Sequence, residues 1–270
     1  MLADVLAREL AREGGDGRQA QGAGKSPGSG GALATGDALA TGEALFVGGG
    51  VGAEGASAPV LDAGCGEGGL ALELAYRGVP VIAADVSGPR LGRAAMGSVG
   101  AGLADRVAFV RADLTRLPLR DACVGGAVAG EVLEHVDDHE RAAHELARVM
   151  MPGAAIALTV PAGPERFGPG DRRAGHRRRY DRDGLTSLLR GAGLEPSYVR
   201  GWGFPFGRLY DRWVQRPALA SRGPWTRSAL AALGGSRAAH WLWSRLFALD
   251  AHVRPGERGS GWLAVARKPR

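Results

Sequence analysis

The feature that most constrains the fold is a glycine-dense turn between an apolar segment and a helix-like segment. Residues 58–61 are apolar apart from Pro59, Asp62 follows, and the turn at 64–69 reads Gly-Cys-Gly-Glu-Gly-Gly before residues 69–77. A strand, a tight turn and a helix in this order form the first unit of a doubly wound α/β sheet, and ligands of such sheets bind at this carboxyl edge. Glycines there permit positive φ and let backbone N–H groups approach a ligand closely.

The glycine spacing alone leaves two ligand classes open. Gly64, Gly66 and Gly69 fit the dinucleotide pattern, which also expects an acid about 20 residues later, where Asp85 stands. A pyrophosphate, however, binds bare N–H groups at a helix N-terminus, where a nearby carboxylate is unfavourable. The turn contains no Lys or Arg, and acids occur in it or after the expected strands: Asp62, Glu67, Asp85, Asp113 and Glu131. This pattern favours a cationic ligand without phosphate, such as S-adenosylmethionine with its ammonium, sulfonium and ribose diol.

Alternating apolar and amphipathic segments predict a mostly parallel sheet with helices between its strands. The expected strands are 58–61, 79–84, 107–111, 122–129 and 156–160, followed by 195–200 and 262–266. The expected helices are 69–77, 87–99, 139–149 and 183–190. The fold class is therefore α/β, a doubly wound, Rossmann-like sheet of seven strands.

Four parts are expected along the chain. Residues 1–57 are expected to form a short amphipathic helix and a flexible Gly/Ala-rich extension, and residues 58–203 to form the Rossmann-like core that binds S-adenosylmethionine. Residues 204–260 are expected to form a Trp-rich helical insertion, and residues 261–270 the final strand of the core. All six tryptophans fall at or beyond Trp202, and Trp241 and Trp243 belong to an unusually broad apolar helix face. Three roles stay open for the insertion: a subdomain or homodimer interface, a lid over an apolar substrate, and transient contact with a membrane surface.

Composition argues against several function classes. The net charge of +6 comes almost entirely from arginine in an Ala- and Gly-rich chain, a bias that resembles GC-rich codon usage, so we expect no nucleic-acid partner. The two cysteines provide no disulfide framework and suit a reducing compartment. Because no segment approaches the ~20 apolar residues of a membrane span and the first dozen residues do not form a secretory signal, we expect a soluble cytoplasmic protein.

Five motifs occur in a fixed order: Asp62-Ala-Gly-Cys-Gly-Glu-Gly, Asp85, Arg111-Ala-Asp-Leu, Glu131-Val-Leu-Glu-His-Val and Arg148-Val-Met-Met-Pro-Gly. With them the chain resembles the class I S-adenosylmethionine-dependent methyltransferases, in particular the branch that methylates ubiquinone and menaquinone precursors, sugars and secondary metabolites. The resemblance covers about residues 58–200 and the final strand. It implies a seven-stranded sheet with an antiparallel last strand, S-adenosylmethionine as cofactor and S-adenosylhomocysteine as product.

The resemblance also implies roles for individual residues. Asp62 and the backbone of the glycine turn hold the methionine end, Asp85 accepts from the ribose hydroxyls, and Asp113 accepts from the adenine amino group, although Asp113 also reads as a plain turn acid. Glu131 closes the site below the sulfonium. The expected cofactor-binding set is Asp62, Gly64, Cys65, Gly66, Asp85, Val86, Asp113, Leu114 and Glu131.

Two histidines are candidate catalytic residues. An oxygen nucleophile must be aligned with the methyl group and must lose its proton, and His is the usual base. His135 follows the fourth strand, and His176 lies in the arginine-rich segment expected over the substrate. The alternatives are a helix-start residue that packs on the donor for His135 and a solvated loop residue for His176. No convincing cluster has metal-ligand spacing, so no metal is expected.

The arginine-rich segment 172–182 suggests an acceptor site, and the candidate substrate-binding residues are Arg177, Arg179, Tyr180 and Trp202. Bidentate arginines suit an anionic acceptor, whereas a solvated basic loop and RNA binding stay open. The sequence favours transfer of a methyl group to a small-molecule acceptor, anionic or apolar, at a hydroxyl oxygen of a natural product, glycan or lipid-linked intermediate. The alternatives are an NAD(P)-dependent oxidoreductase and a donor-binding scaffold or regulator that does not methylate.

Overall fold

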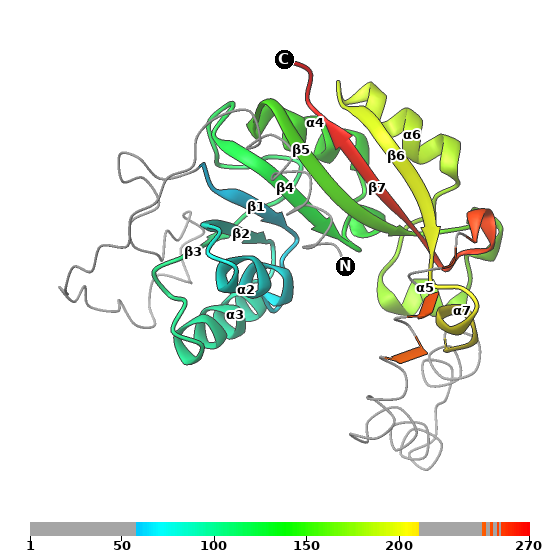
Figure 1. Ribbon diagram of the computed structural model, residues 1–270, viewed down its shortest axis with the longest axis horizontal. Helices are drawn as coiled ribbons and strands as arrows, with labels where there is room; N and C mark the ends of the chain where they lie inside the picture. The colour runs from blue at the N-terminus through cyan, green and yellow to red at the C-terminus, as the bar shows by residue number, and fades with distance from the viewer. Residues whose placement is uncertain (1–57, 211–244, 247–248, 251–252, 254) are drawn as a thin grey trace, which may run out of the picture. The chain divides into compact units, whose positions relative to one another are not determined.

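The computed structural model describes residues 58–210, 245–246, 249–250, 253 and 255–270 (Figure 1). The predicted N-terminal helix and extension and most of the predicted Trp-rich insertion lie outside the described residues.

Seven strands form one sheet in the order β3-β2-β1-β4-β5-β7-β6. Strands β1, β2, β3 and β4 are parallel where they pair. Strands β5 and β7 are antiparallel, because residue 153 bonds to 268 while residue 162 bonds to 260. The predicted doubly wound, Rossmann-like sheet with an antiparallel last strand is confirmed. The strands are β1 Val60–Ala63, β2 Val81–Asp85, β3 Val107–Arg111, β4 Val124–Gly130, β5 Met150–Pro161, β6 Glu195–Trp202 and β7 Gly261–Arg267.

The helices lie between the strands as the sequence predicts, and short turns of 3₁₀ helix occur in the connections. In Figure 1, α2 and α3 lie side by side next to β2 and β3, and α6 lies along β6. The α-helices are α2 Gly69–Tyr76, α3 Gly88–Gly100, α4 His139–Val149, α5 Pro169–Ala174, α6 Arg182–Gly191 and α7 Phe206–Tyr210. The 3₁₀ helices are η2 Leu133–His135, η3 Pro164–Arg166 and η5 Gly256–Arg258.

The largest difference from the sequence prediction is the start of β5. The sequence predicts a helix over 139–149 and a strand over 156–160, but β5 begins at Met150. The Gly153 N–H donates to the Lys268 carbonyl and the Lys268 N–H donates to the Ala154 carbonyl. Pairing with a segment more than a hundred residues away therefore extends the strand, and local sequence does not contain that information.

The chain divides into two compact units. One contains the described residues up to Gly130 together with 141–157 and 267–270, and it holds the glycine turn. The other contains 131–140 and the described residues of 158–266, and it holds the arginine-rich segment.

In the first unit, one arginine joins α4 to the segment before β4. The Arg148 guanidinium forms ion pairs with Glu145 at 2.8 Å and Asp121 at 2.7 Å, and it donates to the carbonyls of Leu117 and Leu119. The Glu145 side chain is only 9% exposed and also accepts from the Leu117 N–H. The hydrogen bond from Arg148 is the main cause of the lowered pKa of Glu145. A charged pair of this kind is expensive to break, because one partner would stay buried and unpaired.

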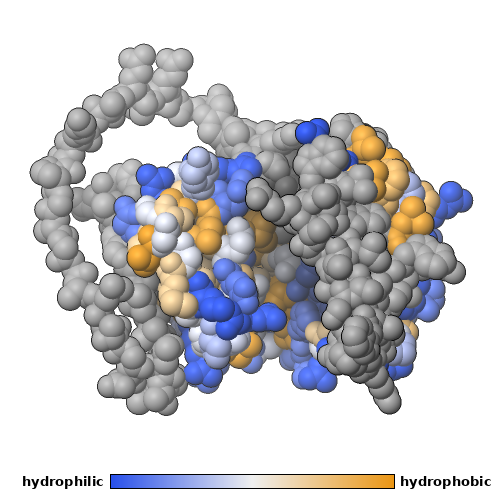
Figure 2. Space-filling model, turned by 90° about the horizontal axis from the view of Figure 1, so that it is seen from below, coloured by the Kyte–Doolittle hydropathy of each residue, from blue (hydrophilic) through white to orange (hydrophobic). Residues whose placement is uncertain are grey.

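Figure 2 shows hydrophilic and hydrophobic residues interspersed on the visible face of the described chain. Exposed apolar side chains such as Tyr76 and Met96 are not unusual on folded proteins. Among the described residues, no helix has both the length and the apolar character needed to cross a membrane.

Candidate active site

The turn after β1 has the backbone geometry that the glycines predict. Gly64, Gly66 and Gly68 have φ of 72°, 55° and 85°, a region that side-chain-bearing residues seldom adopt. A Cβ atom on Gly68 would lie 2.9 Å from the Cβ of Ala94 in α3, so this glycine also lets α3 approach the turn. The turn thus exposes backbone at the carboxyl end of β1, where ligands of such sheets bind.

Asp85, the last residue of β2, holds this turn in place. Its Oδ2 accepts from the Gly66 N–H at 2.9 Å, and its Oδ1 accepts from the Ser87 N–H at 2.8 Å. The side chain is 7% exposed. Because a carboxylate has about four acceptor positions, two remain for donors from a ligand such as the hydroxyls of a ribose.

Asp62, within β1, is a buried acid without a counter-charge. It is 1% exposed, and neither carboxyl oxygen has a hydrogen-bond partner among the described residues. Burial raises its pKa to about 7; the nearby Ala71 N–H opposes the shift without forming a regular hydrogen bond, and the charge of Asp85 adds to it. Buried charges are normally paired, so this carboxyl suits a cationic ligand group that would restore its ionised form.

The other predicted donor-site residues of this unit have varied surroundings. Cys65 is buried, and burial raises the pKa of its thiol. Leu114 is buried and Val86 is 64% exposed. Asp113 is exposed, and its Oδ1 accepts from both the N–H and the hydroxyl of Thr115 at 2.8 Å.

Glu67 differs from the sequence argument, which counted it among the acids that suit a cationic ligand. In the structure it forms an ion pair with Arg93 of α3 at 2.9 Å, and both side chains are more than half exposed. Its charge is therefore balanced within the protein, and the acidic character of this site comes mainly from Asp62 and Asp85.

In the second unit, Glu131 adopts a strained backbone conformation directly after β4. Its φ is 50°, which is uncommon for a residue with a side chain and often marks functional sites. The backbone is held there because the Glu131 N–H donates to the Thr159 carbonyl at 3.0 Å.

Glu131 is followed by a second acid of the same motif, Glu134. Glu131 keeps solvent contact, whereas Glu134 is 0% exposed and neither of its carboxyl oxygens has a regular hydrogen-bond partner among the described residues. Burial raises the pKa of the Glu134 carboxyl, and the charge of Glu131 raises it further, while Arg179 opposes the shift. Two ionised carboxylates are therefore unfavourable at this place, and binding of a proton or a cation would stabilise the pair.

His176 is oriented by a buried acid that the sequence analysis did not identify. The Asp171 side chain is 4% exposed, and its Oδ1 lies 3.1 Å from His176 Nδ1 and 2.7 Å from Arg179 Nε. Burial alone would raise the pKa of Asp171, but the hydrogen bonds from Arg179, Gly168 and His176 and the charge of Arg179 together outweigh it, and the pKa is lowered. An ionised carboxylate only accepts, so His176 Nδ1 carries the proton and Nε2 presents its lone pair.

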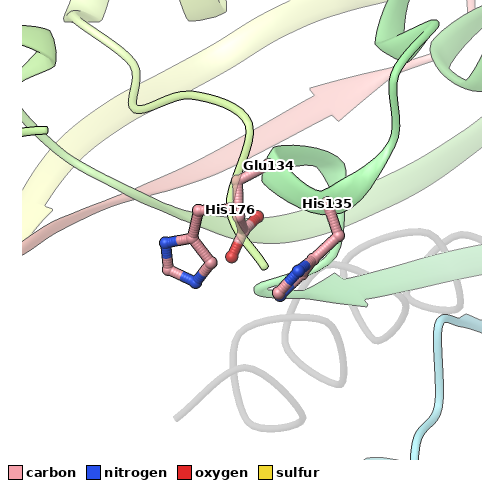
Figure 3. Close-up of side chains that lie close together, drawn as sticks. All are labelled: Glu134, His135 and His176. Carbon is pink, nitrogen blue, oxygen red and sulfur yellow. The ribbon is translucent and has the colours of Figure 1, made fainter. Parts of the chain in front are cut away.

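The His135 ring carries its proton on the same nitrogen as His176, but here a backbone carbonyl and not a carboxylate accepts it. Its Nδ1 lies 3.2 Å from the Gly175 carbonyl oxygen, which can only accept, so Nε2 is again the basic nitrogen. The His135 and His176 rings meet edge to face with centroids 4.8 Å apart. Figure 3 shows these two rings and the Glu134 carboxylate converging from η2 and the segment after α5. The structure thus brings together both predicted catalytic histidines.

The predicted substrate-binding residues are divided among different contacts. Arg179 lies in this cluster, where it also donates to the Ala162 carbonyl. The Arg177 side chain is 57% exposed and pairs with Asp137 at 3.2 Å, while its backbone N–H donates to the Glu134 carbonyl.

Tyr180 and Trp202 have surroundings of another kind. Tyr180 is buried, its hydroxyl lies 3.0 Å from His139 Nδ1, and its carbonyl accepts from the Trp262 indole, contacts that favour a structural role. Trp202 ends β6 with its indole against Gly261.

Two residues of the cluster were missed as functional residues. The sequence motif contains Glu134, three residues after Glu131 and just before His135, but the sequence gives no sign that this side chain is buried. Asp171 had no signal, since nothing local distinguishes an acid five residues before a histidine in an arginine-rich segment.

The sheet order and the acidic site after β1 and β2 define the class: a Rossmann-like methyltransferase fold. Residues 61–158 match the family described as a methyltransferase domain. These matched residues form a class I S-adenosylmethionine-dependent methyltransferase domain. The unpaired Asp62 carboxyl and the open glycine turn fit the cationic cofactor of this class.

Named relatives agree with this assignment. The chain is 36% identical over 104 residues to "O-methyltransferase resE" of Aspergillus sclerotiorum, which covers 38% of this chain and 39% of the relative. It is 36% identical over 138 residues to "Probable S-adenosylmethionine-dependent methyltransferase Rv3030" of Mycobacterium tuberculosis, which covers 50% of this chain and 48% of the relative. The alignments thus span no more than half of either relative.

Among solved structures, the crystal structure of the [4+2]-cyclase SpnF matches with a TM-score of 0.58 and 24% identity. The match covers 79% of this chain and 75% of that one. At this identity the similarity concerns the fold alone.

Proposed function

We propose that this protein is an S-adenosylmethionine-dependent methyltransferase that acts on a small-molecule acceptor at a hydroxyl oxygen. The observation that carries the donor half is the buried, unpaired Asp62 carboxyl beside the glycine turn. A pyrophosphate next to this carboxyl would be repelled, so the site disfavours an NAD(P)-dependent oxidoreductase.

In this proposal, residues of the first unit hold the donor. Asp62 and the backbone of Gly64, Cys65 and Gly66 hold the methionine end, and the free acceptor positions of Asp85 hold the ribose. The further donor contacts in this unit are Val86, Asp113 and Leu114. The cofactor supplies an electrophilic methyl group on a sulfonium.

The acceptor half rests on the histidine cluster of the second unit. Both rings present a basic Nε2, and His176 is held by Asp171 in the arrangement in which a carboxylate orients an imidazole and stabilises its protonated form. Such a histidine can accept the proton of an acceptor hydroxyl. Arg177 and Arg179 are paired with Asp137 and Asp171, so an anionic acceptor would have to share these arginines with the acids that they already bind.

Calorimetry with S-adenosylhomocysteine tests the donor half. We expect wild-type protein to bind it and Asp85→Ala to lose most of the affinity, because both the ribose contact and the support of Gly66 disappear. Asp105→Asn, an exposed acid before β3, is the matched control and should bind normally. Wild type that binds NADH but not S-adenosylhomocysteine would refute the proposal.

A second candidate is a donor-binding protein that does not transfer methyl groups. The similarity to the fold of a [4+2]-cyclase supports it, because one fold can carry different chemistry. Normal S-adenosylhomocysteine binding without S-adenosylmethionine turnover on any acceptor in a panel of hydroxylated compounds would favour this candidate.

A further inference from the structure

A cluster of three side chains in the second unit has the composition and spacing of a metal site. One ligand atom from each of Glu134, His135 and His176 lies within 4.8 Å of the others, and Figure 3 shows the three groups pointing toward one another. Metal–ligand bonds of about 2.1 Å in tetrahedral geometry place two ligands of one ion about 3.4 Å apart. The widest separation therefore needs to close by about 1.4 Å or less, which rotations of the side chains provide.

We propose that Glu134, His135 and His176 bind one divalent transition-metal cation, of the class to which Zn²⁺, Mn²⁺ and Co²⁺ belong. Two imidazoles and one carboxylate form a set that leaves coordination positions open for other ligands. The proposal differs from the expectation of no metal, because the spacing that matters joins residues 135 and 176, which only the fold brings together.

The buried carboxylate of Glu134 is an independent reason for a cation. It is 0% exposed, and neither oxygen has a regular hydrogen-bond partner among the described residues. Buried charges in proteins are paired or coordinate metals. Asp171 is paired with Arg179, and the other two carboxyls of the cluster are those of Glu131 and Glu134.

The orientation of both histidines is a third reason. Histidines that bind metals usually donate their other ring N–H to a carboxylate or a backbone carbonyl, which fixes the tautomer. His176 Nδ1 meets the Asp171 carboxylate, and His135 Nδ1 meets the Gly175 carbonyl. Both Nε2 atoms are thus set as ligands before any cation binds.

The cation deepens the proposed function, on which its catalytic role rests. A hydroxyl oxygen of the acceptor bound at an open position would have a lowered pKa and release its proton to solvent, leaving an oxygen anion as nucleophile. The histidines would then act as ligands and not as bases, so activity would need the cation. Binding of the cation itself does not depend on this role.

The test is titration of the chelator-treated full chain with MnCl₂, followed by calorimetry and Mn²⁺ electron paramagnetic resonance, with CoCl₂ absorption as a second probe. We expect one equivalent to bind to wild type, and His176→Asn and Glu134→Gln to weaken binding by more than about tenfold. His144→Asn, an exposed histidine on α4, should bind like wild type. His135→Asn changes an exposed side chain, so it supplies a ligand variant that should fold if Glu134→Gln does not.

Absence of Mn²⁺, Co²⁺ and Zn²⁺ binding by wild type would overturn the metal site, and so would equal binding by wild type and the His135 and His176 variants. S-adenosylhomocysteine binding, measured on the same samples, separates the two proposals. If it persists without metal binding, the metal site is wrong and the methyltransferase proposal stands. If metal binds and S-adenosylhomocysteine does not, the metal site stands and the methyltransferase proposal is wrong.

Discussion

The substitution Asp62→Asn should weaken donor binding and stabilise the unliganded protein at the same time. The pKa of Asp62 is raised from 3.8 to about 7 by burial, so the folded protein binds this proton more tightly than the unfolded chain does. Stability is therefore lost as the pH rises from 3.8 to about 7, and the full penalty persists above pH 7. At 1.36 kcal/mol for each pKa unit, the penalty is roughly 4 kcal/mol. Asn carries no charge, so the variant should unfold at a higher temperature at pH 8 and lose this advantage below pH 4.

Binding should show the opposite effect of the same charge. If a ligand ammonium pairs with ionised Asp62, wild type must release a proton to bind below pH 7, so S-adenosylhomocysteine should bind about tenfold more weakly at pH 6 than at pH 8. Asp62→Asn should bind weakly at both pH values and without this dependence. Calorimetry at several pH values, with Asp105→Asn as the control, measures both quantities. A wild-type affinity independent of pH, or a variant that keeps the dependence, would refute the reasoning.

Two further substitutions test the surrounding structure by thermal unfolding. Gly68→Ala should destabilise the fold by about 1–3 kcal/mol, because the new Cβ atom would combine a positive φ with a 2.9 Å contact to Ala94. The control Gly69→Ala should be nearly neutral, because a Cβ atom there meets nothing within 4 Å. Equal effects of the two substitutions would contradict this account. Arg148→Ala should cost about 2–3 kcal/mol at pH 7, because it leaves Glu145 buried with a single N–H partner. Since the lowered pKa of Glu145 stabilises the fold above its ordinary value of 4.5, this difference should shrink as the pH falls below 4, and a constant difference would show that the ion pair is not its cause.

The sequence alone determined the fold class and the position of the glycine turn. The turn after β1 is recognisable because positive φ favours glycine at alternate positions, a local requirement that the sequence reveals directly. The last residue of β2, Asp85, was placed by the same reasoning, since the carboxyl ends of parallel strands share one edge of a sheet.

Tertiary structure decided what each acid does. Asp62 and Glu67 look equivalent in the sequence, yet one is buried without a partner and the other forms a surface ion pair with Arg93. Burial and pairing depend on neighbours from other elements, and these set the pKa and the charge that a ligand meets.

The histidine cluster shows the same limit at longer range. His135 and His176 were each recognisable as candidates, but that they lie together with Glu134 follows from the packing of chain segments some forty residues apart. Local periodicity determines helices and strands because their contacts are local. A metal site depends on which segments pack against each other, and that is decided only when the whole chain folds.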